Sequence, residues 1–143
     1  MASFKTFEEI EAYRLARELR KELSIFCRRF PAEERYRLAD QIVRASRSVT
    51  ANIAEGFGRH HHQENVQFCR QGRGSLMELM DHLGCALDEG YATREEYEHL
   101  CGLTGKALKV LNGYIAYLRK CANSGVPTPT TQQPDNPTTS HAN

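Results

Sequence analysis

The sequence predicts an all-α protein, an antiparallel up-down four-helix bundle with a disordered C-terminal tail. Three observations predict this fold class. Four segments place apolar residues at helical spacing, short turns join them, and no apolar run approaches the length of a membrane span. The chain has 143 residues, enough for one domain with its own core. We assign residues 1–121 to the bundle and residues 122–143 to the tail.

The first helix is expected over about residues 6–30. It should begin at a capping box, in which Thr6 and Glu9 each satisfy a backbone N–H of the other. Pro31 should end the helix, because the residue before a proline disfavours helical backbone. Its predicted core stripe is Ala12, Leu15, Ala16, Leu19, Leu23, Phe26 and Phe30.

The second helix is expected over about residues 33–56. Gly56 and Gly58 should supply the backbone freedom that a tight turn needs. The predicted core stripe is Leu38, Ile42, Ala45, Val49 and Ile53.

The third helix is expected over about residues 61–89 and should end at Gly90. Gly72 and Gly74 each cost about 1 kcal/mol of helix propensity relative to alanine. They are either a local weak point or, the interpretation we favour, places where another helix approaches closely. The predicted core stripe is Val66, Cys69, Gly72, Leu76, Leu79, Leu83 and Ala86 or Leu87.

The fourth helix is expected over about residues 93–120. A second capping box, Thr93 with Glu96, marks its start. Its core stripe is Tyr97, Leu100, Thr104, Ala107, Leu111, Tyr114 and Leu118. The tail after it has four of the five prolines, no Lys or Arg and one acidic residue, a composition that cannot bury enough apolar area to fold. Truncation after Lys120 or Cys121 should therefore leave stability unchanged.

The second helix has an unusual surface, because two faces besides its core stripe are small or uncharged. One is a polar stripe: Gln41, Arg44, Ser48, Asn52 and Glu55. The other comprises Val43, Thr50 and Ala54 beside Arg47. A helix of this kind is expected to pack against two neighbours, one within the bundle and one in a second copy.

The polar stripe has two interpretations. A hairpin that turns at residues 57–61 would place Arg44 near Ser75 and Glu78, so a hydrogen-bonded network between helices explains the stripe, with Arg44 and Glu78 as its charged pair. The alternative is a binding site. We favour the network.

The same segment resembles a known family. Arg44, the run Ser48-x-x-x-Asn52-Ile53-Ala54-Glu55-Gly56, Gly58-Arg59 and the block Gly74-Ser75-Leu76-x-Glu78-Leu79 are similar to the four-helix-bundle proteins encoded in 23S rRNA intervening sequences. The resemblance covers roughly residues 5–120. The pair Thr50-Ala51 and the run His60-His61-His62 depart from the family pattern. The resemblance implies a bacterial-type bundle that assembles into a ring, a homopentamer, with no catalytic residues and with nucleic acid as a suspected partner.

The charge distribution favours the same partner. Residues 14–73 hold 13 Lys and Arg against 7 Asp and Glu, a balance of +6, whereas residues 74–143 hold 5 against 8, a balance of −3. Arginine dominates, and its guanidinium suits bidentate contact with phosphate. Interleaved glutamates leave the alternative of a solvated, ion-paired face. The candidate nucleic-acid-binding residues are Arg28, Arg29, Arg47, Arg59, Arg70 and Arg73.

Motifs for enzymatic and metal chemistry are missing from the sequence. Adjacent histidines such as His60, His61 and His62 rarely converge on one ion. A di-iron bundle needs two Glu-x-x-His motifs, and only Glu96-x-x-His99 occurs. No phosphate loop, dinucleotide fingerprint or nucleophile elbow is present. We expect no catalytic residue, no metal site and no cofactor.

The cysteines and the N-terminus indicate a compartment. Five cysteines, an odd number without a Cys-x-x-Cys pair, and no secretory leader favour free thiols in the cytoplasm. The sequence leaves two functional hypotheses open: a ring-forming bundle that binds RNA or DNA backbone, and a scaffold or accessory subunit for another, unidentified protein.

Overall fold

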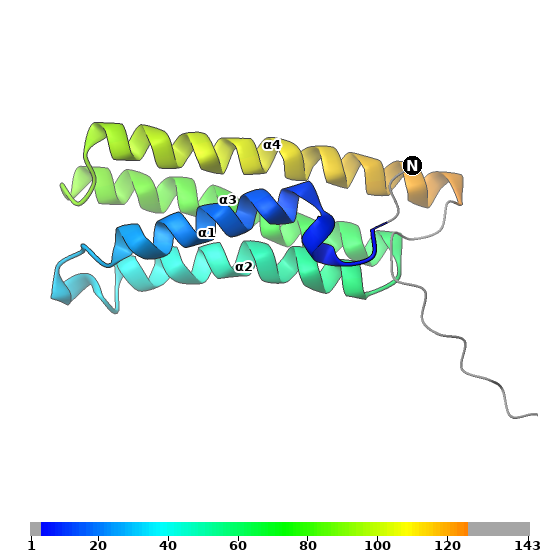
Figure 1. Ribbon diagram of the computed structural model, residues 1–143, viewed down its shortest axis with the longest axis horizontal. Helices are drawn as coiled ribbons and strands as arrows, with labels where there is room; N and C mark the ends of the chain where they lie inside the picture. Colours follow the sequence, from blue (N-terminus) through cyan, green and yellow to red (C-terminus); the bar gives the residue numbers. More distant parts are fainter. Residues whose placement is uncertain (1–3, 126–143) are drawn as a thin grey trace, which may run out of the picture.

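The structure, a computed structural model, describes residues 4–125. Within that range the chain forms four α-helices and two short 3₁₀ helices: η1 (Phe7–Glu9), α1 (Glu11–Cys27), η2 (Ala32–Glu34), α2 (Leu38–Gly58), α3 (His62–Asp88) and α4 (Arg94–Ser124). The predicted up-down four-helix bundle is confirmed. The connections α1–α2 and α3–α4 lie at one end, and the α2–α3 turn lies at the other (Figure 1). Each helix packs on two neighbours, α1 on α2 and α4, and α3 likewise on α2 and α4.

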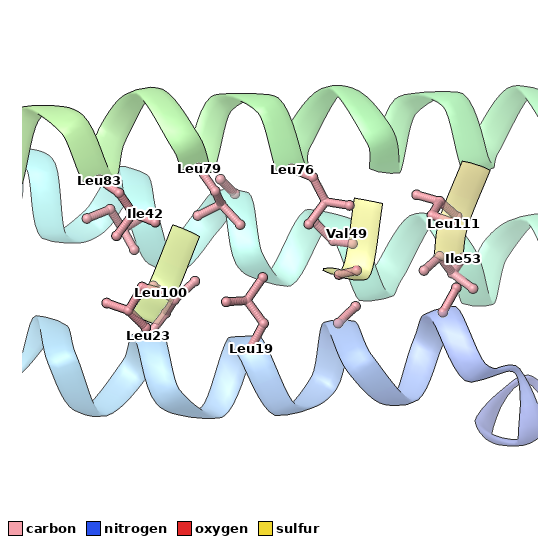
Figure 2. Close-up of a cluster of buried hydrophobic side chains, with 14 of the residues drawn as sticks. Leu19, Leu23, Ile42, Val49, Ile53, Leu76, Leu79, Leu83, Leu100 and Leu111 are labelled. Carbon is pink, nitrogen blue, oxygen red and sulfur yellow. The ribbon is translucent and has the colours of Figure 1, made fainter. Parts of the chain in front are cut away.

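The core forms where the four apolar stripes meet along the bundle axis. Leucines 19 and 23 of α1 and Ile42, Val49 and Ile53 of α2 face Leu76, Leu79 and Leu83 of α3, with Leu100 and Leu111 from α4 (Figure 2). All ten side chains are at most 4% exposed. The predicted stripes therefore hold for every helix, and only their edge residues, such as Leu15, Phe30 and Tyr97, are half-buried.

Helix α1 begins later than expected, and the prediction of a capping box at Thr6 is wrong. The Thr6 side chain makes no capping hydrogen bond, and the Glu9 carboxylate accepts from the backbone N–H of Lys5 (2.8 Å). Ile10 has extended backbone (φ −72°, ψ 124°), and its side chain is 1% exposed. Burying Ile10 and packing Phe7 edge-on against Tyr13 therefore outweigh the local capping pattern.

Helix α2 also begins later, at Leu38 rather than residue 33. Residues 32–34 form η2, and a turn follows over residues 35–37. The Glu34 carboxylate accepts from the backbone N–H of Leu38 and from the Tyr91 hydroxyl, both at 3.1 Å. Glu34 thus ties the α1–α2 connection to the start of α2 and to the α3–α4 connection.

The turn after α2 is not made by glycine. Gly56 and Gly58 both lie inside α2, and the residue with positive φ is His60 (φ 57°). Gly56 is needed for a different reason, because a Cβ there would lie 2.6 Å from Oδ1 of Asn65 and 2.9 Å from Cβ of Phe68. The predicted turn role is wrong, and Gly56 instead permits α2 and α3 to approach each other.

The two glycines of α3 differ from each other. A Cβ at Gly72 would contact the Val49 carbonyl oxygen at 3.5 Å and Asn52 Cβ at 3.6 Å, so close approach is confirmed there. At Gly74 a Cβ would meet nothing within 4 Å, so that part of the prediction is wrong.

Helix α4 begins where the sequence predicts and ends later than predicted. Thr93 and Glu96 form the predicted capping box, each side chain accepting from the other residue's backbone N–H at 3.1 Å. Helix α4 continues to Ser124, with Cys121 buried, and Gly125 (φ 70°) follows it. Residues 122–124 are therefore helical rather than tail, and the predicted tail over residues 126–143 lies outside the described residues.

Candidate nucleic-acid interface

A groove runs along the bundle between α1 and α2. It consists of two adjoining hollows of about 330 and 560 Å³ that share Ser24, Arg28, Val43 and Arg47. The two helices run antiparallel here, and the guanidinium of Arg20 donates to the Thr50 hydroxyl across them (2.9 Å). We call this feature the α1/α2 groove.

The rim of the α1/α2 groove is strongly basic. Its lining includes Arg20, Lys21, Arg28, Arg35 and Arg47. The one carboxylate among its described lining residues is that of Asp40, which pairs with Arg44 on the same helix (2.9 Å).

The five basic side chains differ in how they are engaged. Lys21 pairs with Glu18 (3.6 Å), and Arg20 bonds to Thr50. Arg28, Arg35 and Arg47 are exposed, and no carboxylate within residues 4–125 pairs with them. These three guanidinium groups, which we call the groove arginines, keep their charge and donors available to an anion.

The other predicted binding arginines do not join this groove. Arg29 pairs with Glu96 between α1 and α4, and it also lies over the Phe26 ring (5.3 Å). Arg59 pairs with Glu55 (2.9 Å) and lies over Phe68.

Arg70 and Arg73 line a separate hollow of about 640 Å³ between α3 and α4. Arg73 donates there to the side-chain oxygen of Asn112 (3.2 Å). The six candidates therefore fall into four places: Arg28 and Arg47 line the α1/α2 groove, Arg70 and Arg73 line the α3/α4 hollow, and Arg29 and Arg59 each lie elsewhere.

Only part of the predicted interhelix network forms, because among the described residues one hydrogen bond joins the polar stripe of α2 to the predicted residues of α3. The Ser75 hydroxyl donates to the Ser48 hydroxyl (2.9 Å), and the Asn52 amide donates to the Ser48 carbonyl (2.8 Å) and hydroxyl (3.0 Å). Ser75 is buried, so the hydrogen bonds satisfy polar groups that water does not reach.

The predicted Arg44–Glu78 pair is wrong. Arg44 is 79% exposed and pairs with Asp40, and Glu78 is exposed. The turn lies at residues 59–61, and Ser48, rather than Arg44, is the residue of α2 that bonds to Ser75. Gln41 is exposed, and Glu55 is exposed in its pair with Arg59.

The second uncharged face of α2 is largely covered by another helix of the same bundle. Thr50 is buried and accepts from Arg20, and Val43 is half-buried in the α1/α2 groove. This face therefore packs on α1. Ala51 and Gly58 are exposed on a third, outward side of α2, next to half-buried Ala54.

The titratable groups within residues 4–125 form no cluster that could hold a metal ion. Glu96 pairs with Arg29, and His99 bonds to Glu22 (3.1 Å), so the Glu-x-x-His motif lies on the surface. No three His, Cys, Asp or Glu side chains within residues 4–125 are grouped as a metal site requires. Burial raises the pKa of the Cys27 and Cys69 thiols to about 12, and all five cysteines are free thiols, as the sequence predicts.

Sequence reasoning missed Arg35, which lines the groove, and Tyr36, which follows it in the chain. Arg35 was one of many basic residues, and nothing in the pattern paired it with Arg28 and Arg47. Tyr36 is 83% exposed, and its position outside the four apolar stripes gives it no role in the predicted core. A segment Arg35-Tyr36-Arg37 between two amphipathic helices was the available signal.

Comparison with known proteins gives a family and a fold. The sequence profile of the family described as 23S rRNA-intervening sequence protein matches residues 8–113. A crystal structure from Bacteroides thetaiotaomicron, described as a protein with unknown function from the S23 ribosomal protein family, is similar at a TM-score of 0.69 and 20% identity. The match covers 73% of this chain and 95% of that chain.

No curated protein matches the chain. Within the described residues, no helix has both the length and the apolarity needed to cross a membrane.

Proposed function

The chain belongs to the 23S rRNA-intervening sequence protein family, and we propose that it is a non-enzymatic, ring-forming bundle that binds the backbone of RNA or DNA through the α1/α2 groove. One observation supports this function above the others. Three arginines without a carboxylate partner in the described residues line a groove whose one acidic lining residue is already paired.

The groove arginines suit phosphate for a physical reason. A guanidinium presents donors in a fixed fork that matches two phosphate oxygens, and it stays charged at any physiological pH. Between the levels of Arg20 and Arg28, α1 rises by roughly 12 Å, so the basic rim can follow a backbone over more than one phosphate. Contacts of this kind read charge rather than sequence.

Self-association would strengthen such binding. The outward side of α2 exposes the small residues Ala51 and Gly58, and the Glu55 and Arg59 beside them are paired with each other, so this surface fits packing against a second copy. A closed ring would repeat the α1/α2 groove once per subunit, and linked weak sites bind more tightly than one site does. The family resemblance favours five subunits.

A non-enzymatic role agrees with the state of the nucleophiles. Cys27 and Cys69 are buried, and a thiol with a raised pKa is a poor nucleophile at neutral pH. Free thiols also fit a reducing compartment such as the cytoplasm.

The second candidate function is a scaffold for another protein. The same outward side of α2 favours it, because a surface of small residues can pack against a different chain as well as against a copy. In that case the groove arginines would serve only as solvated surface charge.

A charge-matched pair of variants separates the two functions. In the groove variant, Arg28→Gln, Arg35→Gln and Arg47→Gln remove three charges from the α1/α2 groove. In the control variant, Lys106→Gln, Lys109→Gln and Arg119→Gln remove three charges from exposed positions on α4. Both are compared with the wild type for binding to labelled structured RNA and duplex DNA over a series of salt concentrations.

The groove variant should bind all sequences less tightly and show a flatter salt dependence, because each lost phosphate contact removes about 0.9 from the slope of log K against log salt for a duplex. The control variant should resemble the wild type. Equal loss in both variants would mean that only net charge matters. If the wild type shows no binding near about 50 mM salt, where phosphate contacts are strong, the scaffold function replaces this proposal.

A further inference from the structure

Tyr36 is the most exposed of the large apolar side chains among the described residues, at 83% of its surface. It lies in the turn between η2 and α2, and no hydrogen bond or ring contact holds its side chain in residues 4–125. A single exposed aromatic residue is not unusual on a protein surface. Its neighbours are what make this one informative.

Tyr36 stands between two arginines at the end of the α1/α2 groove. Arg35 lines the groove, and Tyr36 is the next residue in the chain, followed by Arg37. The connection that contains these residues lies at the end of the bundle where α1 leads into α2 (Figure 1). Tyr36 does not line the groove itself, but it directly follows a lining residue in the chain, at the end of the bundle that this connection forms.

The groove also has apolar lining beneath its charged rim. Val43 contributes to both hollows, Ile25 contributes to one, and Phe30, Pro31 and Ala39 contribute to the other. Ile25 is 60% exposed. In a duplex the bases are stacked and paired inside a sheath of phosphates, so they cannot reach such a surface. Unpaired bases can turn toward it.

We propose that the α1/α2 groove takes a single strand of nucleic acid, with an unpaired base stacked on the Tyr36 ring and the phosphates on the groove arginines. The inference rests on the proposed function and specifies its ligand class. A basic groove that follows the backbone, combined with an aromatic ring for the bases, is the arrangement by which proteins hold single strands with little sequence preference.

The test compares three probes with the full chain and two variants, Tyr36→Ala and Tyr36→Phe. The probes are an oligouridine of about 12 nucleotides, within the site sizes of single-strand binders, an abasic strand of equal length, and a blunt RNA duplex. Both variants should keep the wild-type melting curve, since the replaced side chain is almost fully exposed.

The expected result is specific to one probe. Tyr36→Ala should lower affinity for the oligouridine by about 5- to 100-fold, the range for one lost base–aromatic stack, and Tyr36→Phe should retain most of it. Affinity for the abasic strand and the duplex should not change with Tyr36→Ala, because neither offers a free base to the ring.

The inference is overturned if Tyr36→Ala affects no probe or weakens all three equally. It is also overturned if oligoglutamate binds with the same dependence on Tyr36, which would indicate an acidic peptide as the ligand. Failure of the proposed function has a different signature, since the groove variant would then bind every nucleic-acid probe as well as the wild type does.

Discussion

Gly56 and Asn65 are packed so closely that a Cβ at residue 56 would fit only if its neighbours shifted. A Cβ at position 56 would lie 2.6 Å from Oδ1 and 3.1 Å from the backbone oxygen of Asn65. Asn65 is fully buried, donates to the Tyr114 hydroxyl (3.3 Å) and accepts from the Cys69 thiol. The glycine thus allows a hydrogen-bonded asparagine to link α3 to α4 where α2 ends.

Gly56→Ala should destabilise the protein even though alanine is the better helix former. The gain in helix propensity is about 1 kcal/mol, whereas overpacking a core costs about 1–3 kcal/mol. Denaturant unfolding should show a net loss. Gly113→Ala is the control, because a Cβ at this exposed position in α4 meets nothing within 4 Å and should stabilise the protein. A more stable Gly56→Ala variant would contradict the close packing.

The polar contact between α2 and α3 should depend on Ser75 and not on Arg44. Ser75→Ala removes a largely buried hydrogen bond to Ser48 and should lower the free energy of unfolding by about 1 kcal/mol. Arg44→Ala breaks only an exposed pair with Asp40 and should change it by less than about 0.5 kcal/mol. Both are measured by urea unfolding. A larger effect from Arg44→Ala would restore a clamp role for that residue.

Self-association should depend on the outward side of α2. Ala51→Glu places a charge on the exposed surface that we assign to the contact between copies, so light scattering at micromolar protein should show dissociation with helix content unchanged. Ala116→Glu, at an exposed position of α4, is the matched control and should leave the assembly intact. A wild type that is monomeric under these conditions would remove the ring from the proposed function.

The start of α4 should contribute a pH-dependent term to stability. Hydrogen bonds at Thr93, together with the pair to Arg29, hold the pKa of the Glu96 carboxyl below its usual range. A carboxyl with a lowered pKa stabilises the folded state above its unfolded pKa, and that stabilisation is lost as pH falls through the folded pKa.

Glu96→Gln keeps an acceptor for the capping box and loses the charge. It should therefore be less stable than the wild type at neutral pH. The two melting curves should begin to converge near about pH 4, the ordinary range for a glutamate, and meet below the lowered folded pKa. A difference that persists unchanged into acid would mean that the charge of Glu96 is not the cause.

The end of the folded chain should lie beyond Lys120. Cys121 is 3% exposed, the backbone N–H of Gly125 bonds to its carbonyl, and the Ser124 hydroxyl donates to the same oxygen (3.4 Å). A chain that ends at Lys120 loses this buried thiol and the helix end, so it should melt at a lower temperature than a chain that ends at Gly125. Equal melting temperatures would support the earlier boundary that the sequence predicts.

The sequence by itself determined the four helices and which side of each is buried. Apolar spacing depends only on the 3.6-residue period, so stripes such as Ile42, Val49 and Ile53 could be read without knowing any neighbour. The capping box of Thr93 and Glu96 was predictable for the same reason, since both partners lie within one turn. The capping box predicted at Thr6 does not form, because the burial of Ile10 in the tertiary structure determines the backbone conformation there.

Only the tertiary structure decided how the helices align. The hydrogen bond between Ser75 and Ser48 depends on the register of α3 along α2, which is set by the position of the connection between these helices. A helix can slide along its neighbour by one helical turn and still keep the same apolar face inward. For that reason the sequence could not decide which residue of α2 bonds to Ser75. Arg44 instead pairs with Asp40 on its own helix, a local contact that does not depend on this alignment. The same alignment places Arg28, the C-cap residue of α1, beside Arg47 of α2. Arg29, the next residue, pairs with Glu96 of α4 instead, because the backbone at Arg28 is still near-helical and successive helical residues point about 100° apart.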